Sequence, residues 1–173
     1  MSAALAIAVP VRQQAIPCPP LDFATTQDLD LVRQIITVPH IYRSATDDLS
    51  PASEDFEVKP NPVITYLLVF SGDTLFGMFA FYPQNSVTWQ VHTCLLENAF
   101  GWSAEIGKQA MQWIWDNTIC LRITTRVPSF NKLAIRLSES VGMIRCGRDE
   151  KSFLKRGKLH DEVLLGISRP EVR

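Results

Sequence analysis

The chain has 173 residues, 46% of them apolar, which is the size of one ordinary domain with a substantial core. Its 17 basic and 18 acidic residues give a net charge of −1, so we expect no nucleic-acid or membrane partner. The first residues contain an apolar run too short to cross a membrane, followed by several prolines. We predict a flexible tail over residues 1–20, within which residues 4–9 could form a short strand, and one domain over residues 21–173.

The first predicted helix follows the tail. Thr25 and Asp28 have the spacing of a capping box, and apolar residues then recur at helical intervals until Pro39. The acidic, proline-rich run over residues 44–62 predicts a long surface loop with at most one helical turn. Residues that favour strands then recur, separated by turn residues, and predict an antiparallel meander of three strands over residues 63–70, 75–82 and 86–96.

The rest of the chain alternates between helices and strands. Apolar spacing predicts a helix over residues 103–117, followed by a strand over residues 120–127. A last helix begins near Asn131 and ends at Gly142, where a left-handed cap belongs. Its expected apolar stripe consists of Leu133, Leu137 and Val141. A final hairpin over residues 143–154 and 159–167 completes a mixed α/β sheet with helices on both faces.

The four cysteines are widely spaced, with no C-x-x-C pair and no clustered histidines. We therefore expect no metal site and reduced, mostly buried thiols in a cytoplasmic protein. The sequence also has no phosphate loop and no dinucleotide fingerprint, which argues against an unrelated nucleotide-binding domain. The cysteines are Cys18, Cys94, Cys120 and Cys146.

The segment NKLAIRLSESVGM, from Asn131 to Met143, resembles the last helix of the GCN5-related N-acetyltransferase (GNAT) superfamily, N-x-x-A-x-x-L-x-x-x-x-G-F. ATTQDLDLVRQI, from Ala24, looks like the family's first helix. GKLHDEVLLGISR, from Gly157, looks like the closing strand of the branch that acetylates protein N-termini. VHTCLL, QWIW and VPSFN are similar to segments of GNAT-like proteins from tailed phages. The resemblance implies an α/β (α+β) fold with a mostly antiparallel sheet of six to seven strands, whose fourth and fifth strands splay apart.

The resemblance also implies acetyl-CoA, or another acyl-CoA, as co-substrate between the splayed strands, with its pyrophosphate on a loop at residues 97–104. That loop, ENAFGWSA, lacks the family's Arg or Gln and one glycine. Trp102 could stack on an adenine or instead cover the wedge. The implied contacts are the Leu95 backbone and the side chains or amides of Asn98, Phe100, Gly101, Trp102, Ser103, Ala104 and Asn131. Asn131 has a second interpretation, as the cap of the last helix.

For catalysis, the resemblance places His92 as the general base, while the residue taken by itself fits a sheet histidine with satisfied hydrogen bonds better. Ser138 occupies the position of the family's thiolate-protonating tyrosine and is a poorer proton donor. The implied reaction is acyl transfer by direct attack of a primary amine, on a small molecule or a protein N-terminus, in a monomer or homodimer. The acidic segment 47–57 favours a cationic or amine-bearing acceptor. The alternative is a non-catalytic GNAT-like binding or assembly protein, phage-derived.

Overall fold

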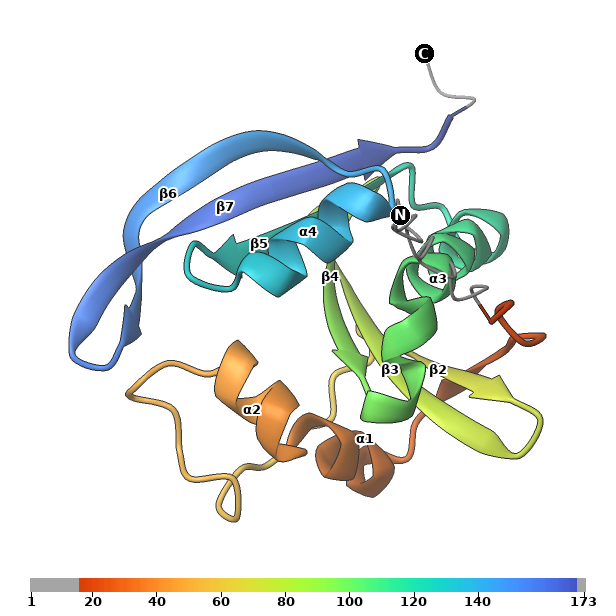
Figure 1. The fold of residues 1–173 in the computed structure, drawn as a ribbon, viewed down its shortest axis with the longest axis horizontal. Helices are drawn as coiled ribbons and strands as arrows, with labels where there is room; N and C mark the ends of the chain where they lie inside the picture. The colour runs from red at the N-terminus through yellow and green to blue at the C-terminus, as the bar shows by residue number, and fades with distance from the viewer. Residues whose placement is uncertain (1–15, 171–173) are drawn as a thin grey trace, which may run out of the picture.

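The computed structural model describes residues 16–170, which form one seven-stranded sheet with helices against both faces (Figure 1). The strand order is β1-β2-β3-β4-β5-β7-β6, and only the β4–β5 pair is parallel. The strands are β1 (Asp22–Thr26), β2 (Thr65–Ser71), β3 (Thr74–Pro83), β4 (Thr88–Leu95), β5 (Arg122–Pro128), β6 (Ile144–Lys155) and β7 (Lys158–Ser168). The helices are α1 (Leu29–Ile36), α2 (Pro39–Ala45), α3 (Ser103–Asn117) and α4 (Lys132–Ser140), with a 3₁₀ segment η1 (Glu97–Trp102) before α3. The predicted fold class is confirmed.

Two cores form because strand residues alternate between the two faces of the sheet. On one face, Leu67 and Val69 of β2 pack in a cluster with α3 and α4. On the other, Tyr66 and Leu68 pack with α1 and α2. The alternation predicted for β4 is confirmed, because Val91 belongs to the α3–α4 core while Cys94 belongs to the α1–α2 core. Each helix pair thus fixes the orientation of one set of β4 side chains.

The start of the described chain differs from the prediction. Residues 22–26 form the edge strand β1, paired antiparallel to β2, and the helix begins only at Leu29. Its N-cap is Asp28, whose carboxylate accepts a hydrogen bond from the Leu31 amide at 3.0 Å, so the predicted capping box at Thr25 is wrong. The polar, threonine-rich sequence here hides a strand because β1 buries little of its surface. The predicted strand within residues 4–9 lies outside the described residues.

Helix α2 was absent from the prediction, which ended the helical region at Pro39. Proline is compatible with the first turn of a helix, where its missing N–H has no partner to lose, and Pro39 begins α2. Ile41 is buried against the α1 core and gives the short helix its anchor. The loop that follows is fixed to the structure by Arg33, whose guanidinium donates to the carbonyl oxygens of Phe56 and Glu54.

Helix α4 keeps its predicted ends, and its predicted apolar stripe is wrong at Leu133 alone, because Leu137 and Val141 are half-buried. Gly142 has a φ of +96°, and its amide donates to the Glu139 carbonyl, which confirms the left-handed cap. Leu133, however, is 78% exposed, and the buried residue of the helix is Ile135. Ala134 and Val141 pack against the α3–α4 core, whereas Leu133 faces outward.

The cysteines are only partly as predicted. All four are free thiols, but Cys146 is exposed and Cys18 is half-buried, whereas Cys94 and Cys120 are buried. Burial raises the pKa of Cys94 to about 12, so this thiol is protonated and unreactive at neutral pH. Within residues 16–170, no helix has the length and apolarity needed to span a membrane. No group of three or more His, Cys, Asp or Glu residues in that range could hold a metal ion.

Candidate active site

The parallel strands β4 and β5 separate partway along their length. Their ladder covers three pairs, from Thr88–Arg122 to Gln90–Thr124. Beyond it both strands continue, β4 to Leu95 and β5 to Pro128, without pairing to each other. The Thr125 hydroxyl donates to the Val91 carbonyl oxygen at 3.1 Å, in place of a backbone bond. The predicted splay of the fourth and fifth strands is therefore present.

A cavity of about 130 Å³ occupies the gap between these strands. Its walls come from β4 and β5, and α4 closes one side, while α2, β6 and β7 contribute one or two residues each. Predicted site residues meet here, since His92, Asn131 and Ser138 all line it. A smaller apolar pocket, lined by Phe79 and Met111 among others, shares Ser138 with this cavity and extends toward α3. The splay thus brings together chemistry from segments that are far apart in sequence.

His92 is the basic group of the cavity. Its Nε2 atom lies 2.7 Å from the hydroxyl oxygen of Tyr82, and the two rings are 5.5 Å apart. The cavity keeps part of the imidazole accessible, but protein atoms surround the rest of the ring. This burial lowers the pKa of His92, so the ring is neutral at neutral pH and able to accept a proton.

Tyr82 is held as a neutral phenol. Burial, as the main cause, raises its pKa to about 12, while a hydrogen bond with the Gln90 side chain and the charge of Arg126 act in the opposite direction. Gln90 is itself fixed by the amide of Gln84, which donates to its Oε1 atom at 2.7 Å. The Tyr82 phenol therefore stays uncharged at neutral pH while it holds the His92 ring in place by a hydrogen bond.

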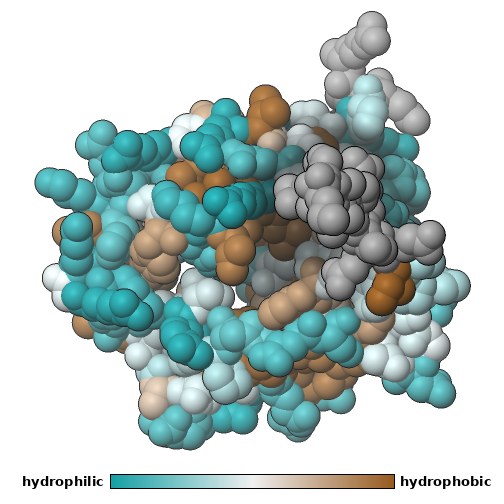
Figure 2. Space-filling view, viewed as in Figure 1, coloured by the Kyte–Doolittle hydropathy of each residue, from teal (hydrophilic) through white to brown (hydrophobic). Residues whose placement is uncertain are grey.

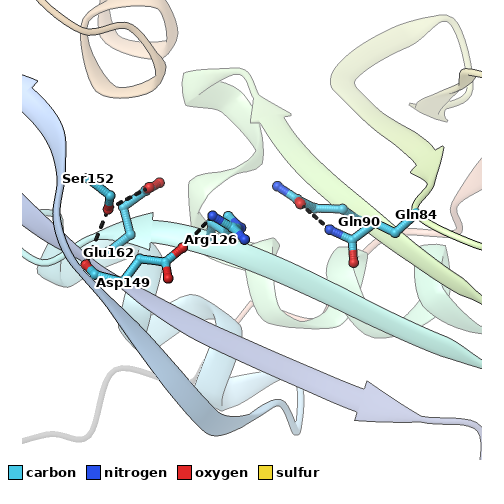
Figure 3. A network of polar contacts seen from close by, with 6 residues as sticks. All are labelled: Gln84, Gln90, Arg126, Asp149, Ser152 and Glu162. Carbon is cyan, nitrogen blue, oxygen red and sulfur yellow. Dashed lines mark hydrogen bonds and ion pairs between the residues drawn. The ribbon is translucent and has the colours of Figure 1, made fainter.

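Charged groups from the last strands complete the site (Figure 3). Arg126 of β5 forms an ion pair with Asp149 of β6, and Glu162 of β7 accepts a hydrogen bond from the Ser152 hydroxyl at 3.0 Å. Arg126 and Glu162 both line the cavity. In Figure 3 the Arg126 side chain lies between this acidic group and the Gln84–Gln90 pair. The cavity thus presents a carboxylate near a neutral histidine, an arrangement that suits a substrate amine.

Ser138 lies in the cavity wall but is engaged within its helix. Its hydroxyl donates to the Ala134 carbonyl oxygen at 2.9 Å. A serine in this arrangement offers its proton to the backbone and keeps only its oxygen lone pairs for a ligand. Its assignment as the acid stays a prediction, and the geometry makes its hydroxyl more suited to accepting a hydrogen bond than to donating one.

Asn131 is the N-cap of α4. Its Oδ1 atom accepts a hydrogen bond from the Ala134 amide at 3.1 Å, which is the capping role left open by the sequence. Within residues 16–170, no hydrogen bond engages its side-chain nitrogen, and the residue lines the cavity. Capping and ligand contact are therefore compatible, because they use different atoms of one amide.

Two substitutions separate these roles. Replacement of Asn131 by alanine should destabilise the protein by about 1 kcal/mol, because the Ala134 amide loses its cap. Replacement by serine keeps an acceptor for that amide and removes the nitrogen, so stability should hold while KM for acetyl-CoA rises. Denaturant unfolding and steady-state kinetics on both variants measure the two effects. Equal KM in wild type and Asn131→Ser would exclude the ligand contact.

The Leu95 carbonyl oxygen, expected to pair with the pantetheine arm, already has a partner. The Nε2 atom of His40 in α2 lies 3.0 Å from that oxygen and donates a hydrogen bond to it, since a carbonyl oxygen can only accept. The imidazole also packs edge-on against Phe100 at 5.4 Å and lies 3.8 Å from the Glu97 carboxylate. A carbonyl oxygen has two lone pairs, so a second donor can still bind there. The contact between the Leu95 backbone and the pantetheine arm therefore stays a prediction.

The predicted pyrophosphate loop is the 3₁₀ segment η1, continuous with α3. The Ala99 amide donates to the Leu96 carbonyl at 3.0 Å, and Asn98 donates from its side chain to the Leu75 carbonyl. Trp102 stacks on Phe76 at 5.7 Å and is absent from the lining of the cavity between the strands. The wedge is thus open and not plugged by indole. Gly101, Trp102 and Ala104 border a separate depression at the start of α3, whose first turn has no side-chain cap.

Sequence reasoning missed three residues of the cavity region, namely Tyr82, Arg126 and Glu162. The signal for Tyr82 was available, because a tight hairpin pairs Ala80 with His92 and so places Tyr82 on the same face. Arg126 and Glu162 depend on β7 pairing with β5, a contact between strands separated by a helix and another strand. No local pattern marks that pairing.

Comparison with known proteins places this architecture. No protein-family model and no curated protein sequence matches the chain. Among solved structures, spermidine N-acetyltransferase from Vibrio cholerae, in complex with CoA and spermine, aligns with a TM-score of 0.70 at 14% identity over 86% of this chain and 95% of that one. The GNAT-family acetyltransferase from Streptococcus pneumoniae gives 0.65 and 16% identity over 87% and 100%. The fold is the GNAT fold. At these identities the likeness shows the fold alone.

Proposed function

We propose that this protein is an acyl-CoA-dependent N-acyltransferase, which moves an acetyl or related acyl group to a primary amine by direct attack. The observation that carries the proposal is the gap between β4 and β5, with a histidine of lowered pKa on its wall. A GNAT-fold neighbour has been solved with CoA, which supports the same co-substrate class here. The reaction needs no metal, because the thioester carbonyl is already activated toward an amine.

The gap fits the acyl-pantetheine arm in shape and chemistry. Beyond Gln90, β4 has no strand partner on its β5 side within the described residues, so backbone groups there are available to a slender ligand with amides. The walls combine apolar side chains, such as Val91 and Leu137, with the free amide nitrogen of Asn131. The first turn of α3, which lacks a side-chain cap, supplies amides suited to the pyrophosphate.

Proton transfer follows from the state of His92. A primary amine is protonated in water and must lose a proton before it can attack the thioester. When His92 donates its Nε2–H to the Tyr82 oxygen, Nδ1 keeps a lone pair and takes that proton, directly or through water. The neutral amine then forms the new C–N bond, the C–S bond breaks, a thiolate leaves, and the acylated nitrogen loses its second proton to water. A thiol has a pKa of about 8.5, so the thiolate takes its proton back from the imidazolium or from water without a strong acid.

Binding of the co-substrate is the first test. Acetyl-CoA at a hundred times its dissociation constant should stabilise the native state by about 2.7 kcal/mol, which thermal unfolding detects as a higher Tm. Release of free thiol with a panel of amines then measures turnover. Absence of a Tm shift at millimolar acetyl-CoA would contradict the proposal and support the alternative of a non-catalytic binding or assembly protein.

The branch of the family, the acceptor, the oligomeric state and the cellular location are also proposals. Support for the protein-N-terminal branch, and for a likeness to phage GNAT-like proteins, comes from the sequence segments alone. The acceptor is an amine on a small molecule or a protein N-terminus, the protein works as a monomer or homodimer, and the cytoplasm is its setting. The amine panel should therefore contain both polyamines and short peptides with free N-termini.

A further inference from the structure

A groove of about 660 Å³ lies beside the reaction cavity. It lies between α2, the start of α4 and the tip of the β6–β7 hairpin, and we call it the basic groove. The space-filling view shows the hollow between these parts, with hydrophilic residues gathered over the hairpin (Figure 2). The charged and titratable residues that line it are all basic: His40, Arg43, Lys132, Lys155, Arg156 and His160.

The cations of the basic groove are not neutralised by ion pairs. Within residues 16–170, none of the four Arg and Lys side chains that line it lies in a salt bridge. Lys155 donates to the Thr46 carbonyl oxygen, a neutral partner. Two carboxylates lie close by: Asp48 accepts the backbone amides of Arg156 and Gly157 and also interacts electrostatically with Lys155 and His160, and Glu97 lies 3.8 Å from the His40 ring. The basic side chains that line the groove outnumber these two acids, and an excess of positive charge favours an anionic ligand.

The basic groove adjoins the reaction cavity, because Ser44 and Asn131 line both. It shares no lining residue with the depression at the start of α3, where the co-substrate pyrophosphate is proposed to bind. The basic groove and that depression are therefore separate hollows, and each can hold one substrate. Phe130, which packs against His160 at 4.9 Å, gives the basic groove an apolar wall as well.

We propose that the basic groove binds an anionic group, a phosphate or a carboxylate, on the acceptor, so that the amine substrate is zwitterionic or acidic. This inference rests on the proposed function and deepens it. Arg side chains bind such groups through paired N–H donors, and Arg43 and Arg156 are both exposed to the groove. The amine would then reach the cavity, toward His92 and Glu162. Polyamines, which the Vibrio cholerae enzyme was solved with, should be poor acceptors here.

A matched pair of acceptors tests the inference. O-phosphoserine and serine amide carry the same amine, but only the first is anionic. We expect kcat/KM for O-phosphoserine to exceed that for serine amide, and for spermidine, by roughly tenfold at low salt, since exposed charge pairs contribute modestly. The ratio should fall toward one in an Arg43→Gln/Arg156→Gln variant and, in wild type, at high salt. Lys158→Gln, an exposed cation outside the groove, should keep it.

Three outcomes would overturn the inference. The first is equal kcat/KM for the two serine acceptors. The second is a rise in KM for acetyl-CoA, but not for acetyl-pantetheine, in the Arg43→Gln/Arg156→Gln variant. Acetyl-pantetheine has no phosphate groups, so this result would mean that the basic groove binds the phosphates of the co-substrate. The third concerns binding without turnover. If no amine is acetylated, the proposed function fails, and calorimetric titration with O-phosphoserine then tests whether the basic groove binds an anion. Binding in wild type that the double variant loses would support the inference, and no binding would overturn it.

Discussion

Replacing His92 with alanine is expected to lower kcat by about 10²–10⁴-fold, the usual effect of removing a positioned general base. The reason is that, among residues 16–170, His92 alone combines access to the cavity, a lowered pKa and a partner, Tyr82, that orients its ring. Thiol release under saturating acetyl-CoA measures the change. The variant should still show the Tm shift with acetyl-CoA, because the role proposed for the imidazole is to deprotonate the amine and not to bind acetyl-CoA.

The pH profile separates a base from a merely structural residue. His92 is active when neutral, so kcat/KM in wild type should rise with pH through its pKa, which lies below the usual value of 6.5. His92→Gln should lose this acidic limb while it keeps the fold. Stability carries the same sign: the unfolded chain binds the proton more readily, so the free energy of unfolding should fall as pH drops below 6.5. An unchanged acidic limb in His92→Gln would remove this residue from the mechanism.

Replacing Gly77 with alanine is expected to destabilise the protein by roughly 2–5 kcal/mol, from backbone strain and overpacking together. Gly77 has a φ of +134°, which side-chain-bearing residues rarely adopt. An added Cβ would lie 2.3 Å from the Cys94 carbonyl oxygen and 2.8 Å from the Leu95 Cα. These are backbone atoms of β4, so relief would require moving the strand that lines the cavity. Denaturant unfolding measures the loss.

Gly101→Ala is the matched control for stability. A Cβ at Gly101 meets nothing within 4 Å, and its φ is not in the left-handed region. Its free energy of unfolding should stay within about 0.5 kcal/mol of wild type. Similar stability for the two variants would contradict this prediction. It would show that β4 can move at little cost in free energy, and that the gap between β4 and β5 is not held rigidly.

Local pattern was sufficient for much of the fold. The alternation in β4 assigned its side chains to two faces, and the α4 segment with its glycine predicted a helix and its cap. It failed where burial was slight or the signal ambiguous, as in edge strand β1 and in α2, which begins with proline. Periodicity reports which face a core covers, so an element that buries little leaves little trace in the sequence.

Some residues of the candidate site could be predicted from the sequence, and others could not. His92, Ser138 and Asn131 were identified from the sequence alone, through a family resemblance, and the structure brings them to one cavity. Tyr82 as the partner of His92, and the basic groove, were decided only by the tertiary structure. The partner depends on the β3–β4 register, and the groove gathers cations from α2, α4 and the last hairpin. Sequence determines what each segment can bury, whereas the distance between side chains on separate segments is set by how the strands pair and the helices pack.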